Sequence, residues 1–324
     1  MILGITGDRH PGERGLGDAA ERYALEEVTG PGPAFDAAWR ALDGFFGPRN
    51  EIERRDVLER WLTDPVTDGP IRVRYHLVVA RAADGSLAGA RDCFVTLDGE
   101  RCVVLLSHSL VEPAHRRTGL AGLLRTAPAA LARRAVADGG MPRETPILLV
   151  AEMEPVDPAD PGSLVRLLAY GRAGYVAVPP AAMPYCQPDF RDLDALGEDQ
   201  RPIPMVLVAR WLDHEGAAIP AAHVEGIVRG FRAIHLRACR RADLDALLGR
   251  ALAALGAYPH DPVPVLPLAG PAAEILEPLL KSRVLLNYPP AWRGLVPDAD
   301  ADLAALVVAA ASPAPARGTL TPGG

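Results

Sequence analysis

The chain has 324 residues and carries a formal net charge of −7 at pH 7. That length is enough for one large domain or two modest ones, each with a substantial buried core. The negative charge argues against nucleic-acid binding, which needs a basic face, and the apolar runs are too short to cross a membrane. A cationic small molecule is a more natural partner than a polyanion.

The start of the chain and its cysteines indicate a compartment. Residues 1–10 lack a basic region followed by an apolar core, so we expect no secretory signal. The four cysteines lie far apart, without the Cys-x-x-Cys spacing of a zinc site and without an evident disulfide framework. These features predict a cytoplasmic protein with no bound metal.

The first part of the chain predicts an arm, two helices and three strands. Residues 1–33 are rich in Gly and Pro and predict an N-terminal arm. Apolar residues at helical spacing then predict two amphipathic helices, over 35–46 and 57–62. Alternating strand-forming residues separated by turn signals such as Asp98-Gly99 predict three antiparallel strands. These strands span residues 72–80, 87–97 and 101–111.

Helices and strands alternate in the part that follows. We expect a long helix that ends near Ala137, a strand over 146–154 and a helix over 161–173. Two further strands, over 175–178 and 203–212, complete the pattern.

The most informative segment joins the third strand to the long helix. It spans residues 111–124 and reads Val-Glu-Pro-Ala-His-Arg-Arg-Thr-Gly-Leu-Ala-Gly-Leu-Leu. The free N–H groups of a first helical turn and the positive end of the helix dipole would converge here on an anion. Gly119 allows a close backbone approach, and Arg116 and Arg117 add positive charge. The segment predicts a pyrophosphate cradle; the alternative is an ordinary basic turn between a strand and a helix.

Two patterns resemble a known family. The pattern Pro-x-x-Arg-x-x-Gly-x-Ala over 113–121 resembles the acyl-CoA pyrophosphate loop of the GNAT acetyltransferase superfamily, which follows a strand ending in Val-x-Pro. The segment Tyr-Gly-Arg-Ala-Gly-Tyr over 170–175 resembles the Tyr-x-x-x-Gly-Phe segment at the end of that family's fourth helix. Both patterns occur in the family's order of elements, and the resemblance covers roughly residues 34–212.

The resemblance implies an α/β (α+β) fold, with a mixed central sheet flanked by helices, and acetyl-CoA as co-substrate. It implies that the strands ending near Val111 and Glu154 are parallel and splay apart, so that the pantetheine arm enters between them. A main-chain N–H near Leu110 or Val111 would then stabilise the oxyanion. The implied cofactor-binding residues are Leu110, Val111, Arg116, Arg117, Thr118, Gly119, Leu120, Ala121 and Ser163. Arg166 departs from the family, which usually has Ala or Ser there.

The resemblance and the strand pattern also name catalytic candidates. Tyr170 stands where the family places the tyrosine that protonates the leaving thiolate; the alternative is a tyrosine that only packs. Glu152 and Glu154 alternate on one strand face and are candidate bases, with two solvated charges as the alternative. His108 is a further candidate base, although a hydrogen-bonded core histidine is the more ordinary interpretation. Tyr185 either lines the acceptor cleft or anchors its loop.

Residues beyond 212 lie outside the resemblance. Apolar stripes over 224–238 and 244–255 predict two helices that need a covering surface. That surface is the core, a second copy in a homodimer, or the two helices themselves. The expected division is an arm over 1–33, an acetyltransferase domain over 34–212, a helical C-terminal extension over 213–311 and a disordered tail over 312–324.

Taken together, these patterns predict an N-acetyltransferase that moves an acetyl group from acetyl-CoA to a primary amine by direct transfer. The acceptor would be a small molecule or a peptide, with no nucleic acid or membrane as partner. Two alternatives stay open. One is a non-catalytic acyl-CoA-binding or regulatory module, and the other is an acyltransferase that uses a longer acyl-CoA or a hydroxyl acceptor.

Overall fold

The computed structural model describes residues 16–49, 51–154, 166, 169–171, 173–188, 202–214 and 216–268. Its helices are α1 (Leu16–Arg22), α2 (Pro33–Phe46), α3 (Arg55–Thr63), α4 (Leu120–Asp138), α7 (Ala221–His235) and α8 (Arg241–Ala257). The strands of the central sheet are β1 (Ala24–Val28), β2 (Val66–Asp68), β3 (Ile71–Arg81), β4 (Leu87–Leu97), β5 (Cys102–Val111), β6 (Ile147–Met153), β7 (Val176–Ala177), β8 (Tyr185–Gln187), β9 (Ile203–Trp211) and β12 (Leu266–Pro267). Two short strands, β10 (Ala218–Ile219) and β11 (Val263–Pro264), pair apart from it.

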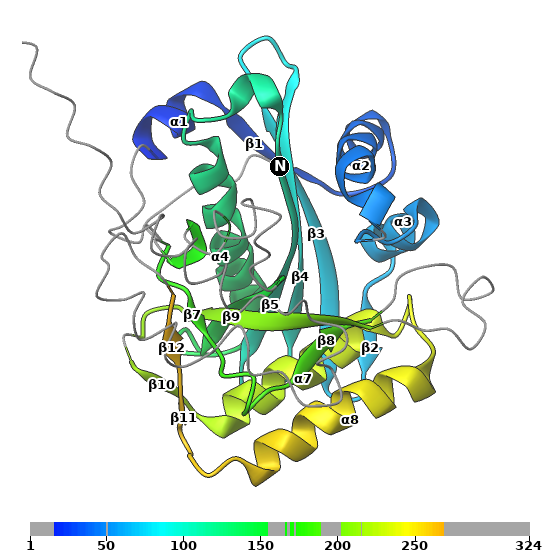
Figure 1. Ribbon diagram of the computed structural model, residues 1–324. Coiled ribbons are helices and arrows are strands. Elements are labelled where there is room, and N and C mark those ends of the chain that lie inside the picture. The colour runs from blue at the N-terminus through cyan, green and yellow to red at the C-terminus, as the bar shows by residue number, and fades with distance from the viewer. Residues whose placement is uncertain are drawn as a thin grey trace, which may run out of the picture.

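The central sheet is mixed and runs in the order β1-β3-β4-β5-β6-β9-β7-β12, with β2 added beside β3 and β8 beside β9. Strands β5 and β6 are parallel, and the other pairs are antiparallel. Helices α1 and α4 cover one face, and α2, α3 and α7 cover the other (Figure 1). This arrangement confirms the predicted fold class.

Strand alternation explains why both faces are covered. On β3, Tyr75 and Leu77 enter the core beneath α2, α3 and α7, whereas Val78 and Ala80 enter the core beneath α4. The strands are therefore apolar on both sides, as expected for a sheet packed between two helical layers. The helices and strands predicted over 35–137, 146–154 and 203–212 all form, with their ends displaced by a few residues. Most of the predicted helix over 161–173 lies outside the described residues.

The predicted N-terminal arm is wrong for residues 16–28. They form α1 and β1, and β1 is an edge strand that pairs with β3. Two glutamates obscure the strand in the sequence, but Glu27 is buried against His76 at 2.7 Å and Arg134 at 2.7 Å. Burial opposes the charge on Glu27, yet these two partners lower its pKa to about 2. Residues 1–15 lie outside the described residues.

The helices of the C-terminal extension pack on the core and on each other. Helix α7 lies against β3, β4 and β5, and α8 contacts α7 and β8. Close approach of α7 requires small residues, because a Cβ at Gly230 would lie 2.9 Å from Thr96 Oγ1. Arg232 joins the layers through ion pairs with Asp68 at 2.6 Å and Asp245 at 2.7 Å. Of the covering surfaces left open by the sequence, the core and the neighbouring helix are therefore the ones used within the chain.

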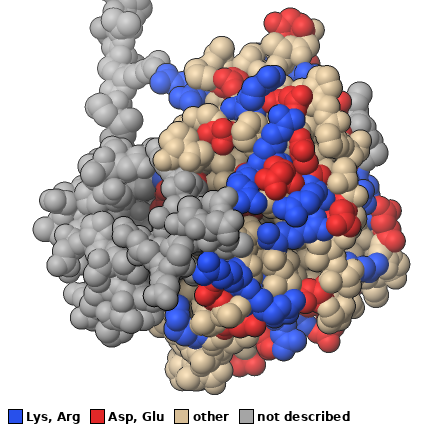
Figure 2. Space-filling view, turned by 90° about the vertical axis from the view of Figure 1, so that its right-hand side faces the viewer, with Lys and Arg blue, Asp and Glu red and all other residues tan. Residues whose placement is uncertain are grey.

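The face that carries α2 and α3 shows interspersed cationic and anionic side chains (Figure 2). Arg55 on this face pairs with Asp36 at 2.6 Å and with Glu59 at 2.8 Å, so opposite charges neutralise one another locally. None of the described helices is long and apolar enough to pass through a membrane.

A buried ion pair sits where β5 is irregular. In the ladder between β4 and β5, Arg91 stands opposite Ser109 and Cys93 stands opposite Leu106. Over this stretch β5 therefore has one residue more than β4. Asp92 is fully buried opposite the extra residue and accepts bonds from the His108 N–H at 2.6 Å, from His108 Nδ1 at 3.0 Å and from the Tyr75 hydroxyl at 2.9 Å. The second ring nitrogen, Nε2, donates to the Glu51 carbonyl at 2.7 Å.

These contacts make His108 a satisfied core histidine with a stable positive charge. Burial opposes that charge, but the Asp92 carboxylate outweighs burial and raises the pKa of His108 to about 9. The pKa of Asp92 is lowered, because His108 overcomes the cost of burying its charge. His108 therefore already holds its second ring proton near neutral pH. It is a weak candidate for a general base there.

Asp92→Asn should destabilise the fold by about 3–5 kcal/mol, the range for breaking one side of a buried ion pair. In the wild type, the contribution of His108 is complete below its unfolded pKa of 6.5 and is lost as pH rises through about 9. The variant should lack this loss between pH 6.5 and 9, because its His108 is already neutral. Urea unfolding at several pH values measures both effects.

Asp84→Asn is the control, since Asp84 is an exposed turn residue bonded to Ser86. It should keep the alkaline loss of stability. An Asp92→Asn variant that retained the wild-type pH dependence would contradict the role given to the buried pair.

Candidate active site

A cavity opens where β5 and β6 separate. The two strands pair only from Cys102 to Leu105 and from Ile147 to Val150, although both continue further. A bulge bends a strand and increases its twist, so the irregularity after Leu105 directs β5 away from β6. The cavity has a volume of about 590 Å³, within the range of small-molecule sites. The resemblance implied this splay, and the sheet confirms it.

The direction of the β5 backbone groups follows from one hydrogen bond. The Glu112 N–H donates to the Ala88 carbonyl at 2.9 Å, so it points toward β4. Because N–H directions alternate along a strand, the Leu110 N–H points the same way, and those of Ser109 and Val111 point toward the gap. Of the two N–H groups predicted to face the thioester, the Val111 group is the one directed at the cavity.

The predicted phosphate cradle has a backbone that only certain residues tolerate. Gly119 is the N-cap of α4 and is left-handed, with φ of +88°, and Arg117 is also left-handed, with φ of +64°. Among the described residues no side chain caps α4, so the N–H groups of its first turn remain available to an anion. A non-glycine residue in the left-handed region is uncommon and concentrates at functional sites.

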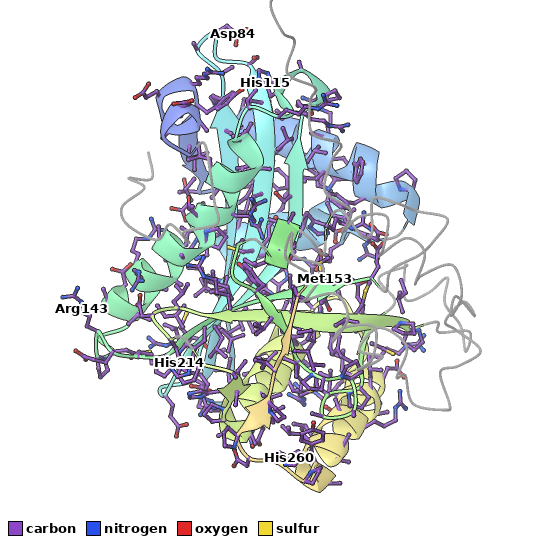
Figure 3. The ribbon with its side chains drawn as sticks, turned by 60° about the vertical axis from the view of Figure 1, so that its left-hand side comes forward. Asp84, His115, Arg143, Met153, His214 and His260 are labelled. Atoms are coloured by element: carbon purple, nitrogen blue, oxygen red, sulfur yellow. The ribbon has the colours of Figure 1, made fainter. Side chains whose placement is uncertain are left out.

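Residues near the N-terminus brace this cradle. The Tyr23 hydroxyl lies 3.1 Å from Thr118 Oγ1 and 3.1 Å from His115 Nδ1. Thr118 in turn donates to the His115 carbonyl at 2.7 Å. His115 lies at the same end of the molecule as the β3–β4 turn, which carries Asp84, and Met153 lies near the middle (Figure 3). Sequence reasoning missed Tyr23, because it assigned this region to an arm.

The structure places the predicted cofactor-binding residues in different ways. Leu110, Val111, Arg116 and Ala121 line the cavity. Arg117, Thr118 and Gly119 shape the cradle beside it, and the Leu120 side chain is buried in the core, so that only its backbone N–H can contact a ligand. Ser163 lies outside the described residues.

Glu152 is buried at the β6 side of the cavity. Its side chain is 9% exposed, accepts a hydrogen bond from the Tyr185 hydroxyl, and has Oε1 4.0 Å from His235 Nε2. Burial raises the pKa of Glu152 to about 7, with the Tyr185 hydrogen bond opposing that rise and nearby Glu53 adding to it. Burial also lowers the pKa of His235 to about 3, so this ring is neutral. The Glu152 carboxyl can therefore exchange a proton near neutral pH.

Glu154 also lines the cavity but has a different environment. It forms an ion pair with Arg166, and both side chains are more than a third exposed. Glu154 already has a cationic partner, whereas Glu152 is buried with the Tyr185 hydroxyl as its partner. Glu154 and Arg166 therefore fit the wall of the site.

Two polar residues that the sequence did not single out also face the cavity. Glu53 is buried, and burial raises its pKa. Gln187 on β8 is 8% exposed, and its Oε1 has no hydrogen-bond partner among the described residues. Glu53 lies in an irregular segment before α3 and Gln187 lies on a three-residue strand, so neither position carries a recognisable pattern.

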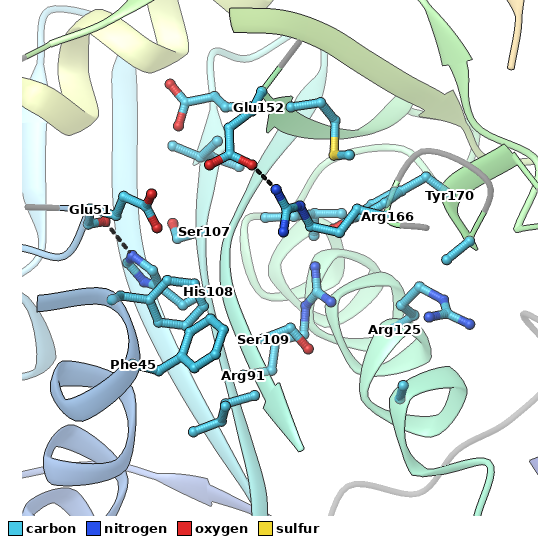
Figure 4. Close-up of a pocket in the computed structure, with 18 of the residues that line it drawn as sticks. Phe45, Glu51, Arg91, Ser107, His108, Ser109, Arg125, Glu152, Arg166 and Tyr170 are labelled. Atoms are coloured by element: carbon cyan, nitrogen blue, oxygen red, sulfur yellow. Dashed lines mark hydrogen bonds and ion pairs between the residues drawn. The ribbon is translucent and has the colours of Figure 1, made fainter. Parts of the chain in front are cut away.

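Tyr170 lines the opposite side, where its ring meets Tyr175 edge to face with centroids 4.9 Å apart. Three arginines line the cavity as well: Arg91 on β4, Arg125 on α4 and Arg166. Figure 4 shows Arg91 and Arg125 toward α4, with Glu152 on another wall. The cavity is thus cationic on the side of the cradle and carboxylate-lined on the side of β6. Within the described residues, no group of three or more His, Cys, Asp or Glu is placed to hold a metal ion.

No family model and no curated protein matches the sequence. Among solved structures, the chain is similar to a GNAT-family acetyltransferase from Staphylococcus aureus, with 10% identity over 59% of this chain and 100% of that one and a TM-score of 0.34. It is similar to spermidine N-acetyltransferase from Vibrio cholerae, solved with CoA and spermine, with 13% identity over 59% of this chain and 96% of that one and a TM-score of 0.31.

A third match is to the GCN5-related glucosamine N-acetyltransferase region of a fungal multi-domain GH3 beta-N-acetylglucosaminidase. It has 18% identity and a TM-score of 0.34, and covers 48% of this chain and only 17% of that one. All three of these solved structures are described as acetyltransferases. At such low TM-scores a functional assignment depends on the geometry of this cavity and its loop.

Proposed function

We propose that the chain is a GNAT-type acyltransferase that moves an acetyl group from acetyl-CoA to a primary amine of a small molecule. The observation that carries this proposal is the cavity in the β5–β6 gap, which has a phosphate cradle at one end and a buried carboxyl with a raised pKa at the other. An acyl-CoA donor needs the phosphate cradle, and an amine acceptor needs a carboxyl that can take its proton. The alternative of a pure binding module leaves the buried Glu152 without a role.

The donor side follows from the backbone. The diphosphate of acetyl-CoA would accept from the first-turn N–H groups of α4, with Arg116 beside it. The pantetheine arm would run along the free edge of β5. The thioester carbonyl would then meet the Val111 N–H, which stabilises the oxyanion of the tetrahedral intermediate.

The acceptor side follows from the carboxylates. An ammonium entering between Glu53 and Glu152 would meet negative charge and the Gln187 side-chain oxygen, which has no hydrogen-bond partner among the described residues, so the pocket favours a cation with several N–H donors. Glu152 would take a proton from this amine and free its lone pair for attack on the thioester. Tyr170, on the donor side, would give its proton to the sulfur as the C–S bond breaks.

The direct test is release of free thiol from acetyl-CoA in the presence of amines, amino acids, polyamines and aminoglycosides. We expect turnover with at least one cationic primary amine. If CoA bound but no acceptor stimulated thiol release, the binding-module alternative would be correct.

Gly119→Val should weaken acetyl-CoA binding by about 10-fold or more, since a β-branched residue at a left-handed position costs about 1–3 kcal/mol and displaces the cradle. Isothermal calorimetry with CoA measures the change. Gly85→Val is the matched control, because Gly85 has φ of +82° in the β3–β4 turn with open space around it. Equal loss of CoA binding in both variants would argue against a specific cradle.

Glu152→Gln should lower kcat/KM by about 100-fold or more with the best amine of the panel, the usual range for loss of a general base. Only the carboxylate form can accept the proton, so wild-type kcat/KM should rise with pH through about 7. This rise should be absent in the variant. The control is Glu154→Gln, which removes the neighbouring carboxylate and should keep the rise near pH 7; loss of the rise in that variant alone would move the base to Glu154.

A further inference from the structure

Arg91 is a buried cation that no carboxylate in the described part of the chain neutralises. The residue is 2% exposed, and its Nε and Nη1 have no hydrogen-bond partner among the described residues. The groups that interact with it include the hydroxyls of Tyr170 and Tyr175 and the thiol of Cys93. An isolated buried charge costs several kcal/mol, so a stable fold retains one only where other interactions compensate or where an anion arrives to meet it.

Geometry decides which anion can reach Arg91. Arg91 lies on β4 directly opposite Ser109 of β5, lines the cavity, and is within hydrogen-bonding reach of the Tyr170 hydroxyl. Figure 4 shows its guanidinium directed into the space between β5 and α4. Phosphates would lie at the cradle, which follows Val111 at the end of β5 and has an arginine of its own, Arg116, lining the cavity. The negative charge that forms beside Tyr170 is the one on the departing sulfur.

We propose that Arg91 is a catalytic residue that stabilises the leaving thiolate of CoA together with Tyr170; this inference rests on the proposed function. When the tetrahedral intermediate collapses, the C–S bond breaks and its electron pair moves to sulfur. Tyr170 gives its proton to that sulfur, and the resulting phenolate is stabilised by N–H donation from Arg91. The nitrogen of the ammonium loses two protons in all: Glu152 takes the first and passes it to solvent, and the nitrogen gives the second to water once it is bonded to the acetyl carbon. The phenolate regains one proton from water. The products are the amide and the free thiol of CoA.

Dependence on the leaving group separates this role from simple packing. Arg91→Met keeps an unbranched side chain and removes the charge. With acetyl-CoA it should lower kcat by about 100-fold, as for loss of one donor to a developing anion, with little change in CoA affinity. With the acetyl thioester of an aryl thiol, whose thiolate needs no such help, kcat/KM should fall by less than about 3-fold. Arg91→Lys, which keeps the charge, should lose less than Arg91→Met.

Arg166→Met is the control for removing another arginine of the cavity. Arg166 already pairs with Glu154, so any loss should be equal for the two donors. If Arg91→Met lost activity by the same factor with acetyl-CoA and with the aryl thioester, Arg91 would only support the fold. That result would overturn the inference. A loss confined to acyl-CoA donors whose acyl chain ends in a carboxylate would overturn it too, because Arg91 would then bind the acyl group.

Titration of bound CoA needs no acceptor and no variant that might misfold. The ultraviolet absorbance of the thiolate should show CoA ionising about one pH unit lower on the wild-type protein than in solution, as expected beside a cation. No such displacement on the wild type would contradict the inference. If the wild type failed to bind CoA at all, the proposed function would fail with it; binding and turnover with an unaffected Arg91→Met would overturn the inference alone.

Discussion

The site depends on one buried ion pair at an irregularity of the sheet. Asp92 can be buried without solvent only because His108 and Tyr75 supply donors to it. The extra residue that places His108 opposite Asp92 also bends β5 away from its parallel neighbour. A regular β5 would continue its ladder along β6 and leave no room for a ligand. The interaction that stabilises the sheet is thus also the one that opens it.

The gap matters because it separates two electrostatic environments. One wall carries arginines and the uncapped start of α4, and the other carries Glu53 and Glu152, with burial raising the pKa of both carboxyls. Carboxyls buried close together resist simultaneous ionisation, so a cationic guest stabilises their charged forms. The C-terminal extension takes part in this wall, since His235 at the end of α7 and Tyr185 beneath that helix both contact Glu152.

Local patterns in the sequence were sufficient for most of the fold. Strand alternation, turn residues and helical spacing predict β3 to β6, α2 to α4 and the stripes of α7 and α8, because each is set by neighbours in the chain. Strand β1 was missed because Glu27 becomes compatible with burial only through His76 and Arg134, which are distant in sequence.

The site was predictable to a lesser degree. The glycine loop and Tyr170 are local patterns and were found from the sequence. Glu53, Arg91 and Gln187 face the cavity because of how separate elements pack, and an isolated charged residue in a strand or loop gives no local signal of this. The different surroundings of Glu152 and Glu154 likewise depend on tertiary packing, since Glu154 pairs with Arg166 and Glu152 is buried against Tyr185.

A structure determined with CoA tests the central claim most directly, since that claim concerns where the cofactor lies. The account predicts that the diphosphate contacts the first-turn N–H groups of α4, that the pantetheine follows the free edge of β5 near Val111, and that the sulfur lies beside Tyr170 and Arg91. CoA bound elsewhere on the protein, with the β5–β6 gap closed or filled by side chains, would contradict it.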